Sequence, residues 1–155
     1  MKEWHIYIDG ASLGNPGLSG AGMVAYDEDG NEVWREGVHL GRMTNNMAEY
    51  EALIRALRKV GDHAALPVRV YTDSQLVANQ VCGKYRIKNE RLRVYLEEAH
   101  RLIGKLSHFS VKYIPREGNR LADKLAKDAA ARGAGAWSRG ASPEESPGIE
   151  GQDGP

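Results

Sequence analysis

The sequence lacks cysteine pairs, long apolar runs and an excess of either charge. Among its 155 residues Cys82 is the single cysteine, so no disulfide can form within the chain. No apolar run approaches the roughly 18 residues that a membrane-spanning helix requires, and no secretory leader pattern opens the chain. These absences argue against a disulfide-stapled secreted scaffold and a membrane protein, and they lead us to expect a cytoplasmic location without a membrane partner.

The charges balance overall but are unevenly distributed. The chain has 21 basic and 21 acidic side chains, with a net charge of zero. Residues 133–155 carry one basic and four acidic side chains, which leaves 20 basic and 17 acidic ones in residues 1–132. The body of the chain is therefore mildly basic, which is compatible with nucleic-acid binding without requiring it.

The composition changes near residue 132. Apolar residues make up 41% of the whole chain and charged residues 27%, which is typical of a globular protein. Residues 133–155 are instead rich in Gly, Ala, Ser, Pro and Glu, and they carry too little apolar surface to offset the entropy of ordering. We expect one domain over residues 1–132 and a disordered tail over residues 133–155.

The hydrophobic pattern of residues 1–132 predicts three opening strands, followed by alternating helices and strands. The DEDGN turn, with its Asp-Gly pair, joins the second and third strands as a hairpin. The predicted strands cover residues 4–9, 21–26, 32–39, 68–72 and 110–114. The predicted helices cover residues 46–60, 74–80, 89–104 and 119–132. This order predicts an α/β fold, with a mixed sheet and helices packed on its faces.

Several common active-site signatures are also missing. The chain has no phosphate-binding P-loop, no dinucleotide-binding glycine fingerprint and no His/Cys cluster with zinc spacing. What stands out instead is a set of four acids, each at a strand end or near a helix start: Asp9, Glu49, Asp73 and Asp123. In open α/β sheets, ligand sites gather at strand ends and at the adjacent helix N-termini.

Each of these acids also has a purely structural explanation. Glu49 could close a capping box with Asn46, and Asp73 could cap the helix that follows it. Asp123 could pair with a lysine one turn later, and Asp9 could begin a turn. Taken jointly these explanations weaken, because all four acids border apolar segments.

If the four acids converge, they have one physical task in common. Carboxylates a few ångströms apart repel one another unless a cation lies among them. Oxygen-only ligands suit hard cations such as Mg²⁺. Two such ions can activate a water and stabilise the leaving oxygen in phosphodiester hydrolysis. The sequence therefore predicts a divalent-metal site.

Four segments resemble the motifs of the type 1 ribonuclease H family, in the family's order. They are YIDGASLGNPG, TNNMAEYEAL, YTDSQ and NRLADKLAKDAA, and the resemblance covers residues 3–132. It implies a ribonuclease H-like mixed five-stranded sheet, with three antiparallel strands followed by two parallel ones and helices on both faces. DnaQ-like exonucleases share a similar sheet, but they begin with an Asp-x-Glu motif, whereas Gly10 and Ala11 follow Asp9 here.

The resemblance implies an activity and a cofactor. It implies endonucleolytic hydrolysis of the RNA strand of an RNA–DNA hybrid, leaving a 5′-phosphate and a 3′-hydroxyl. The four acids would be both catalytic residues and metal ligands, holding two Mg²⁺ ions when substrate is bound, with Mn²⁺ as a substitute. We also expect a monomer, because the predicted sheet uses up the apolar stripes of the helices.

The resemblance also implies contacts to the hybrid. Short polar groups that reach the minor groove and the 2′-hydroxyl suit recognition that is independent of sequence. Helix capping by Asn45 or Asn46 is the structural alternative for that pair. The implied substrate-binding residues are Gly10, Ala11, Ser12, Asn15, Thr44, Asn45, Asn46 and Gln75.

The chain departs from the family pattern in two places. Many members carry a histidine in the loop before the last carboxylate, and here that loop, YIPREGN, has none. Arg116 and Glu117 are the candidates for part of its role. Some members also have a basic protrusion, which is reduced here to a short basic segment that includes Lys84, Arg86 and Lys88. Phosphate contact is our hypothesis for these three, and a solvated charged face is the alternative.

Two other functions stay open at this stage. A non-catalytic hybrid-binding module could retain the fold, although such a relative would be expected to lose at least one acid. A nuclease of the same architecture could act on double-stranded RNA or on RNA–DNA junctions, because these share A-like minor-groove features.

Overall fold

The computed structural model describes residues 3–61, 66–83 and 87–138. Its strands are β1 (Trp4–Leu13), β2 (Gly17–Tyr26), β3 (Glu32–Met43), β4 (Val68–Thr72) and β5 (Phe109–Tyr113). Its helices are α1 (Asn45–Val60), α2 (Gln75–Val81), α3 (Glu90–Ile103), the 3-10 turn η2 (Arg116–Asn119) and α4 (Arg120–Ser138). None of the described helices is long and apolar enough to cross a membrane.

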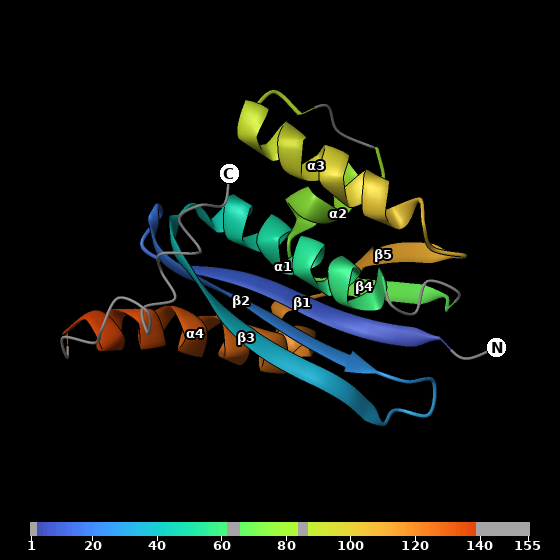
Figure 1. Ribbon diagram of the computed structural model, residues 1–155, viewed down its shortest axis with the longest axis horizontal. Helices are drawn as coiled ribbons and strands as arrows, with labels where there is room; N and C mark the ends of the chain where they lie inside the picture. Colours follow the sequence, from blue (N-terminus) through green and yellow to red (C-terminus); the bar gives the residue numbers. More distant parts are fainter. Residues whose placement is uncertain (1–2, 62–65, 84–86, 139–155) are drawn as a thin grey trace.

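The strands form one mixed sheet in the order β3-β2-β1-β4-β5 (Figure 1). β1, β2 and β3 pair in antiparallel fashion, and β4 and β5 continue the sheet in parallel with β1. In the β1–β4 register Ile8 lies opposite Thr72, so the residues that follow, Asp9 and Asp73, reach the same edge. The predicted fold class is confirmed.

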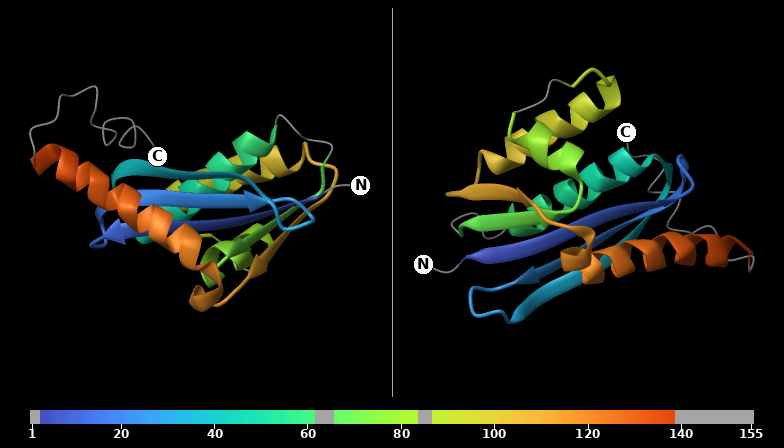
Figure 2. Two further views of the ribbon diagram at one scale, coloured as in Figure 1. Left: turned by 90° about the horizontal axis from the view of Figure 1, so that it is seen from below. Right: turned by 180° about the vertical axis from the view of Figure 1, so that it is seen from behind.

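Helices cover both faces of the sheet, as Figures 1 and 2 show. α1 packs on one face, with α3 against it, and α4 crosses the other face. Glycines make this close approach feasible: a Cβ on Gly10 would meet the α1 backbone at Ala48, and one on Gly22 would lie 2.1 Å from the Ala122 carbonyl oxygen of α4. The core between these layers includes Ile6 and Ile8, which are fully buried.

The first three strands are longer than the pattern predicted. β1 runs through Asp9 to Leu13, β2 begins at Gly17, and β3 extends to Met43. The extra residues are rich in glycine, which lowers strand propensity and hides these segments from a periodicity analysis. Packing against α1 and α4 provides the order that propensity does not.

The last helix is also longer than predicted. α4 continues to Ser138, so the first six residues assigned to the disordered tail are helical. Glycine alternates with alanine at the start of this stretch, and each glycine costs about 1 kcal/mol of helix propensity, so the composition gave no helix signal. The remainder of the predicted tail, residues 139–155, lies outside the described residues, as do Lys84 and Arg86.

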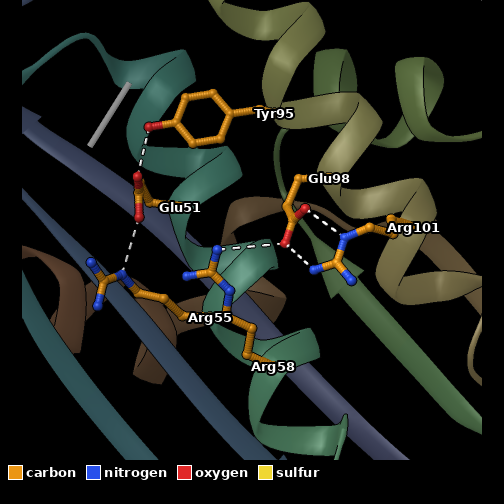
Figure 3. Close-up of polar contacts among 6 residues, drawn as sticks. All are labelled: Glu51, Arg55, Arg58, Tyr95, Glu98 and Arg101. Atoms are coloured by element: carbon orange, nitrogen blue, oxygen red, sulfur yellow. Dashed lines mark hydrogen bonds and ion pairs between the residues drawn. The ribbon is translucent and has the colours of Figure 1, made fainter. Parts of the chain in front are cut away.

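A buried polar network joins α1 to α3 (Figure 3). Glu51 is buried on α1, where it accepts a hydrogen bond from the Tyr95 hydroxyl of α3 at 2.7 Å and pairs with Arg55 at 3.1 Å. Nearer the surface, Arg58 of α1 lies 3.5 Å from Glu98 of α3. A buried carboxylate is tolerated only when its oxygens are satisfied, and both oxygens of Glu51 have partners.

Candidate metal and nucleic-acid site

Asp9 and Asp73 come from the two central parallel strands. Asp9 lies within β1, and its side chain is buried with 4% exposure. Asp73 follows the last residue of β4, and the parallel register carries both side chains to one edge. Asp73 does not cap α2, because Ser74 is the cap and its Oγ accepts from the Val77 N–H at 3.2 Å. The carboxylate of Asp73 is therefore not used by the helix.

Glu49 reaches the same place from α1. Thr44 caps this helix, and its Oγ1 accepts from the Met47 N–H at 3.2 Å. The structural alternatives, capping by Asn45 or Asn46 and a capping box between Asn46 and Glu49, are therefore not seen, because the Thr44 hydroxyl already caps the helix. Glu49 instead accepts a hydrogen bond from the Gly10 N–H at 3.0 Å.

Asp123 comes from the first turn of α4, on the opposite side of the sheet from α1. Lys127, one turn later, lies 3.2 Å from its carboxylate. Asn119 sets the start of this helix against β1, because its buried Nδ2 donates to the Ile8 carbonyl at 2.8 Å. Asn119 thus ties the start of α4 to the strand that carries Asp9.

The four carboxylates meet in one small region. Carboxylate oxygens of Asp9, Glu49 and Asp73 all lie within 4.8 Å of one another. Asp123 adjoins this trio closely enough to interact with Asp9. The structure therefore brings together residues that lie far apart along the chain.

This crowding penalises the ionised forms of Asp9 and Glu49. Burial, and then the negative charges of Glu49 and Asp73, raise the pKa of Asp9 well above its ordinary value. Burial, and then Asp73, raise the pKa of Glu49, while the Gly10 N–H and Arg116 act in the opposite direction. A divalent cation among these oxygens would remove the penalty.

The donor set fits a hard cation. Its oxygens come from carboxylates alone, which suits Mg²⁺-like ions better than zinc. The Oδ2 atom of Asp73 is buried, and within the described part of the chain it has no hydrogen-bond partner. A buried anionic oxygen without a partner is costly, so this atom also favours a bound cation.

A cleft of about 270 Å³ opens over the carboxylates. Besides the four acids it is lined by Gly10, Ala11, Asn45, Ser74, Tyr113 and Arg116. Ser74 and Tyr113 were not predicted as site residues. A serine after a strand resembles an ordinary helix cap, and a tyrosine in a strand resembles core, so neither carried a distinguishing signal. Tyr113 is in fact 47% exposed.

Three of the predicted substrate-binding residues, Gly10, Ala11 and Asn45, line this cleft, and several others have local roles within the protein. The Asn15 side chain accepts from the Asn45 N–H at 3.0 Å, which ties the β1–β2 turn to the start of α1. Ser12 Oγ bonds to the Met43 carbonyl at 3.1 Å. Asn46 and Gln75 are exposed, in the first turns of α1 and α2. The Gly10 N–H is already donated to Glu49, so this amide has a role within the protein.

The auxiliary candidates separate into two groups. Arg116 lines the cleft, and its charge opposes part of the rise in the pKa of Glu49. Glu117 and Lys88 are exposed, and neither is among the described residues that line the cleft.

A second buried hydrogen bond links the helices next to Glu49 and Asp73. The hydroxyl of Tyr50, which follows Glu49, donates to Gln80 Oε1 of α2 at 2.5 Å, and both residues are buried. The Tyr50 ring stacks on Tyr95 of α3 with centroids 5.7 Å apart. α1 and α2 are thereby held together beside the site.

Comparison with known proteins gives a consistent assignment. The model of the reverse transcriptase-like family matches residues 7–129. A ribonuclease HI of Halobacterium salinarum is 40% identical over 125 residues, which is 81% of this chain and 63% of that protein. A bifunctional protein of Mycobacterium tuberculosis is 37% identical over 80% of this chain and 34% of its own length. The chain thus spans less than two thirds of either relative.

Solved structures agree with this assignment. The crystal structure of ribonuclease H1 from Halobacterium salinarum superposes with a TM-score of 0.81 and 38% identity, covering 84% of this chain and 98% of that one. The LC11 ribonuclease H1, crystallised with an RNA/DNA hybrid, has a TM-score of 0.80 and 35% identity over the same shares. Together with the matching family model and the carboxylate cluster, these likenesses identify the chain as a member of the type 1 ribonuclease H family.

Proposed function

We propose that the protein is a divalent-metal-dependent endonuclease that hydrolyses the RNA strand of RNA–DNA hybrids and leaves 5′-phosphate and 3′-hydroxyl ends. The observation that carries this proposal is the convergence of Asp9, Glu49 and Asp73 within 4.8 Å, with Asp123 adjoining. A hybrid-bound relative at 35% identity supports the choice of substrate. All four acids come from one chain, which is compatible with an active monomer.

The four acids would hold Mg²⁺, with Mn²⁺ as a substitute. When bound, such ions supply an activated water and stabilise the leaving oxygen. The protein's own contribution is to hold its ligands in place beforehand. The Gly10 N–H fixes Glu49, and Lys127 restrains Asp123. Neither carboxylate then needs to reorganise when the substrate arrives.

The polar rim would recognise the hybrid by its shape. Amide and hydroxyl groups on both sides of the cleft offer donors and acceptors to the minor groove and to the RNA 2′-hydroxyls. Thr44 would contact a DNA phosphate. Arg116 would assist hydrolysis from its place near Glu49. Glu117 would take part only if its exposed side chain turned toward the cleft. The remaining proposed contacts are Ala11, Ser12, Asn15, Asn45, Asn46 and Gln75.

A three-substrate assay tests this function. Labelled RNA–DNA hybrid, double-stranded RNA and double-stranded DNA are incubated with the protein in Mg²⁺ or in EDTA. The proposal requires cleavage of hybrid RNA that stops in EDTA. Binding without cleavage would indicate a hybrid-binding module, and a preference for double-stranded RNA would indicate the related nuclease. Asp73→Asn serves as the matched inactive variant, because it keeps the shape of the side chain while removing the charge.

A further inference from the structure

A second pocket lies beside the N-terminal end of α4, where Gly118 and Leu121 form part of its lining. Its volume is about 390 Å³, and β1, β2 and the β2–β3 turn form most of its wall. The η2 turn separates it from the acidic cleft: Arg116 lines the cleft, whereas Gly118 lines the pocket. The pocket is therefore distinct from the metal site.

Three aromatic side chains, His5, Tyr7 and Tyr26, line this pocket, and Tyr71 stacks against two of them. Tyr7 and Tyr71, on neighbouring strands, stack with centroids 4.7 Å apart, and the Tyr26 ring meets Tyr7 edge-on at 5.7 Å. The His5 ring also stacks on Tyr71, and its Nδ1 lies 2.8 Å from the Tyr71 hydroxyl. All four rings are only half-buried. Contacts among the rings fix their orientation while part of the aromatic surface faces solvent.

The carboxylates that line the pocket have no lysine or arginine beside them among its described lining residues, although Arg35 and Arg69 lie outside it near Tyr26 and Tyr71. Asp27 and Glu28 are these carboxylates. The Asp27 carboxylate is held in place, because its Oδ1 accepts from the Asp29 and Asn31 N–H groups at 2.9 Å each. Glu28 is exposed at the edge of the pocket. Carboxylates beside aromatic faces create a negative potential that attracts a cation.

We propose that this pocket binds the guanidinium group of an arginine in a basic segment of a partner protein. A planar guanidinium can stack on the Tyr7 or Tyr26 ring while its N–H groups donate to Asp27 and Glu28. Arginine suits the site better than lysine, because its flat, weakly hydrated head group both stacks and forms several directed hydrogen bonds. This inference is independent of the proposed nuclease activity.

A nucleic-acid strand is the competing occupant, since a base would also stack on tyrosine. Its phosphates, however, would approach Asp27 and Glu28, where like charges repel. The charge of the pocket therefore favours a cationic partner over a polyanionic one.

An NMR titration of the ¹⁵N-labelled full chain tests this inference. The probes are N-acetyl-arginine amide and its uncharged isostere, N-acetyl-citrulline amide. We expect the arginine probe to shift the amide signals of Tyr7, Tyr26 and Glu28, with a dissociation constant on the order of millimolar. The citrulline probe should bind at least roughly fivefold more weakly, because it keeps the shape but lacks the charge.

Matched variants localise the effect. Glu28→Lys should weaken arginine binding roughly fivefold or more, whereas Asp29→Lys, at an exposed acid of the same turn outside the pocket lining, should not. Tyr26→Leu keeps apolar bulk without the ring and should also weaken binding. Hybrid cleavage should be unchanged in Glu28→Lys, so failure of this inference is distinguishable from failure of the proposed function.

Three results would each overturn the inference. The first is equal binding of the arginine and citrulline probes. The second is the absence of signal changes at the pocket with the arginine probe. The third is displacement of that probe by a ten-nucleotide uridine strand that itself binds the pocket more tightly, which would assign the site to nucleic acid instead.

Discussion

At the scale of single residues, Asp9 is placed where an ionised carboxylate is unfavourable without a cation. Its side chain is buried in a strand, and two further carboxylates lie within 4.8 Å of it. Burial first, and then these neighbours, raise its pKa. The folded metal-free protein therefore holds protons that the unfolded chain has released, and this imbalance makes stability depend on pH.

Asp9→Asn should raise thermal stability in EDTA while abolishing cleavage. Between about pH 4, where an unfolded carboxyl titrates, and the raised pKa of the folded state, the folded protein binds more protons than the unfolded one. Its free energy of unfolding therefore falls as pH rises, and the substitution removes the part of this decrease that Asp9 causes. We expect a melting temperature higher by roughly 3 °C or more at pH 8, and a smaller gain at pH 5.

Thermal melts followed by circular dichroism measure this difference. Asp29→Asn, at an exposed turn position, is the control and should leave the melting temperature unchanged. If Asp9→Asn does not raise the melting temperature, or raises it equally at both pH values, the proposed electrostatic strain is contradicted.

Arg116→Ala should reduce cleavage modestly and change its pH profile. Arg116 lines the cleft and opposes the rise in the pKa of Glu49, so its removal leaves more of Glu49 protonated at low pH. We expect a loss of roughly fivefold in kcat near pH 6, equivalent to about 1 kcal/mol, and a smaller loss at pH 9. Arg116→Lys should restore part of the activity. Unchanged turnover at every pH would end this role for Arg116.

Much of the site could be predicted at this scale, because each acidic residue and its apolar neighbours can be read directly from the sequence. Four acids beside apolar segments predicted a shared task, and the structure brings them together. The helix caps were harder to predict: Thr44 and Ser74 hold the cap positions that asparagine or aspartate could equally have filled. Tyr113 could not be predicted, because its exposure depends on where β5 ends relative to the cleft.

At the scale of helices and strands, glycines set how closely the helices approach the sheet. Gly22 faces α4 so tightly that a Cβ would lie 2.1 Å from the Ala122 oxygen and 2.7 Å from the Ala126 nitrogen. Both are backbone atoms within a helix, so neither can move alone. Because α4 carries Asp123, this contact also sets the depth of one side of the site.

Gly22→Ala should destabilise the fold by more than about 2 kcal/mol, because α4 must shift as a unit to admit the methyl group. Gly61→Ala is the matched control. A Cβ there meets no atom within 4 Å among the described residues, and φ is −49°. That variant should change stability by less than about 1 kcal/mol. Urea midpoints measure both changes, and equal midpoints would contradict the packing argument.

The types of the elements could be predicted, but not all their lengths. The apolar periodicity of residues 46–60 predicts a helix, and α1 agrees with it to within one residue. The glycine-rich ends of β1 and β2 have no such periodicity, because a residue without a side chain gives no pattern to read. Their order comes from the helices packed on them, which is tertiary information.

At the scale of the whole molecule, nucleic-acid affinity should come from a surface wider than the carboxylate cluster. Lys88 is exposed just ahead of α3, while Lys84 and Arg86 lie outside the described residues. α3 is tied to α1 through Glu51 and Tyr95, so the start of α3 is linked to the helix that carries Glu49. The basic segment and the cleft could therefore engage one hybrid together.

Replacing Lys84 and Arg86 with alanine should weaken hybrid binding equally across sequences. Each lost phosphate contact should reduce the slope of log K against log salt by roughly 0.9. Fluorescence anisotropy between low and moderate salt measures the slope, and Lys124→Ala on α4 is the control. An unchanged slope would favour the alternative of a solvated charged face.

The central claim is that carboxylates from β1, α1, β4 and α4 together hold divalent metal, and calorimetric titration with Mg²⁺ or Mn²⁺ tests it most directly. We predict that binding to the unmodified chain is lost in Asp9→Asn, Glu49→Gln and Asp73→Asn, weakened in Asp123→Asn, and unchanged in Asp128→Asn, an exposed acid on α4. Metal binding that persists undiminished in the first three variants would contradict the account.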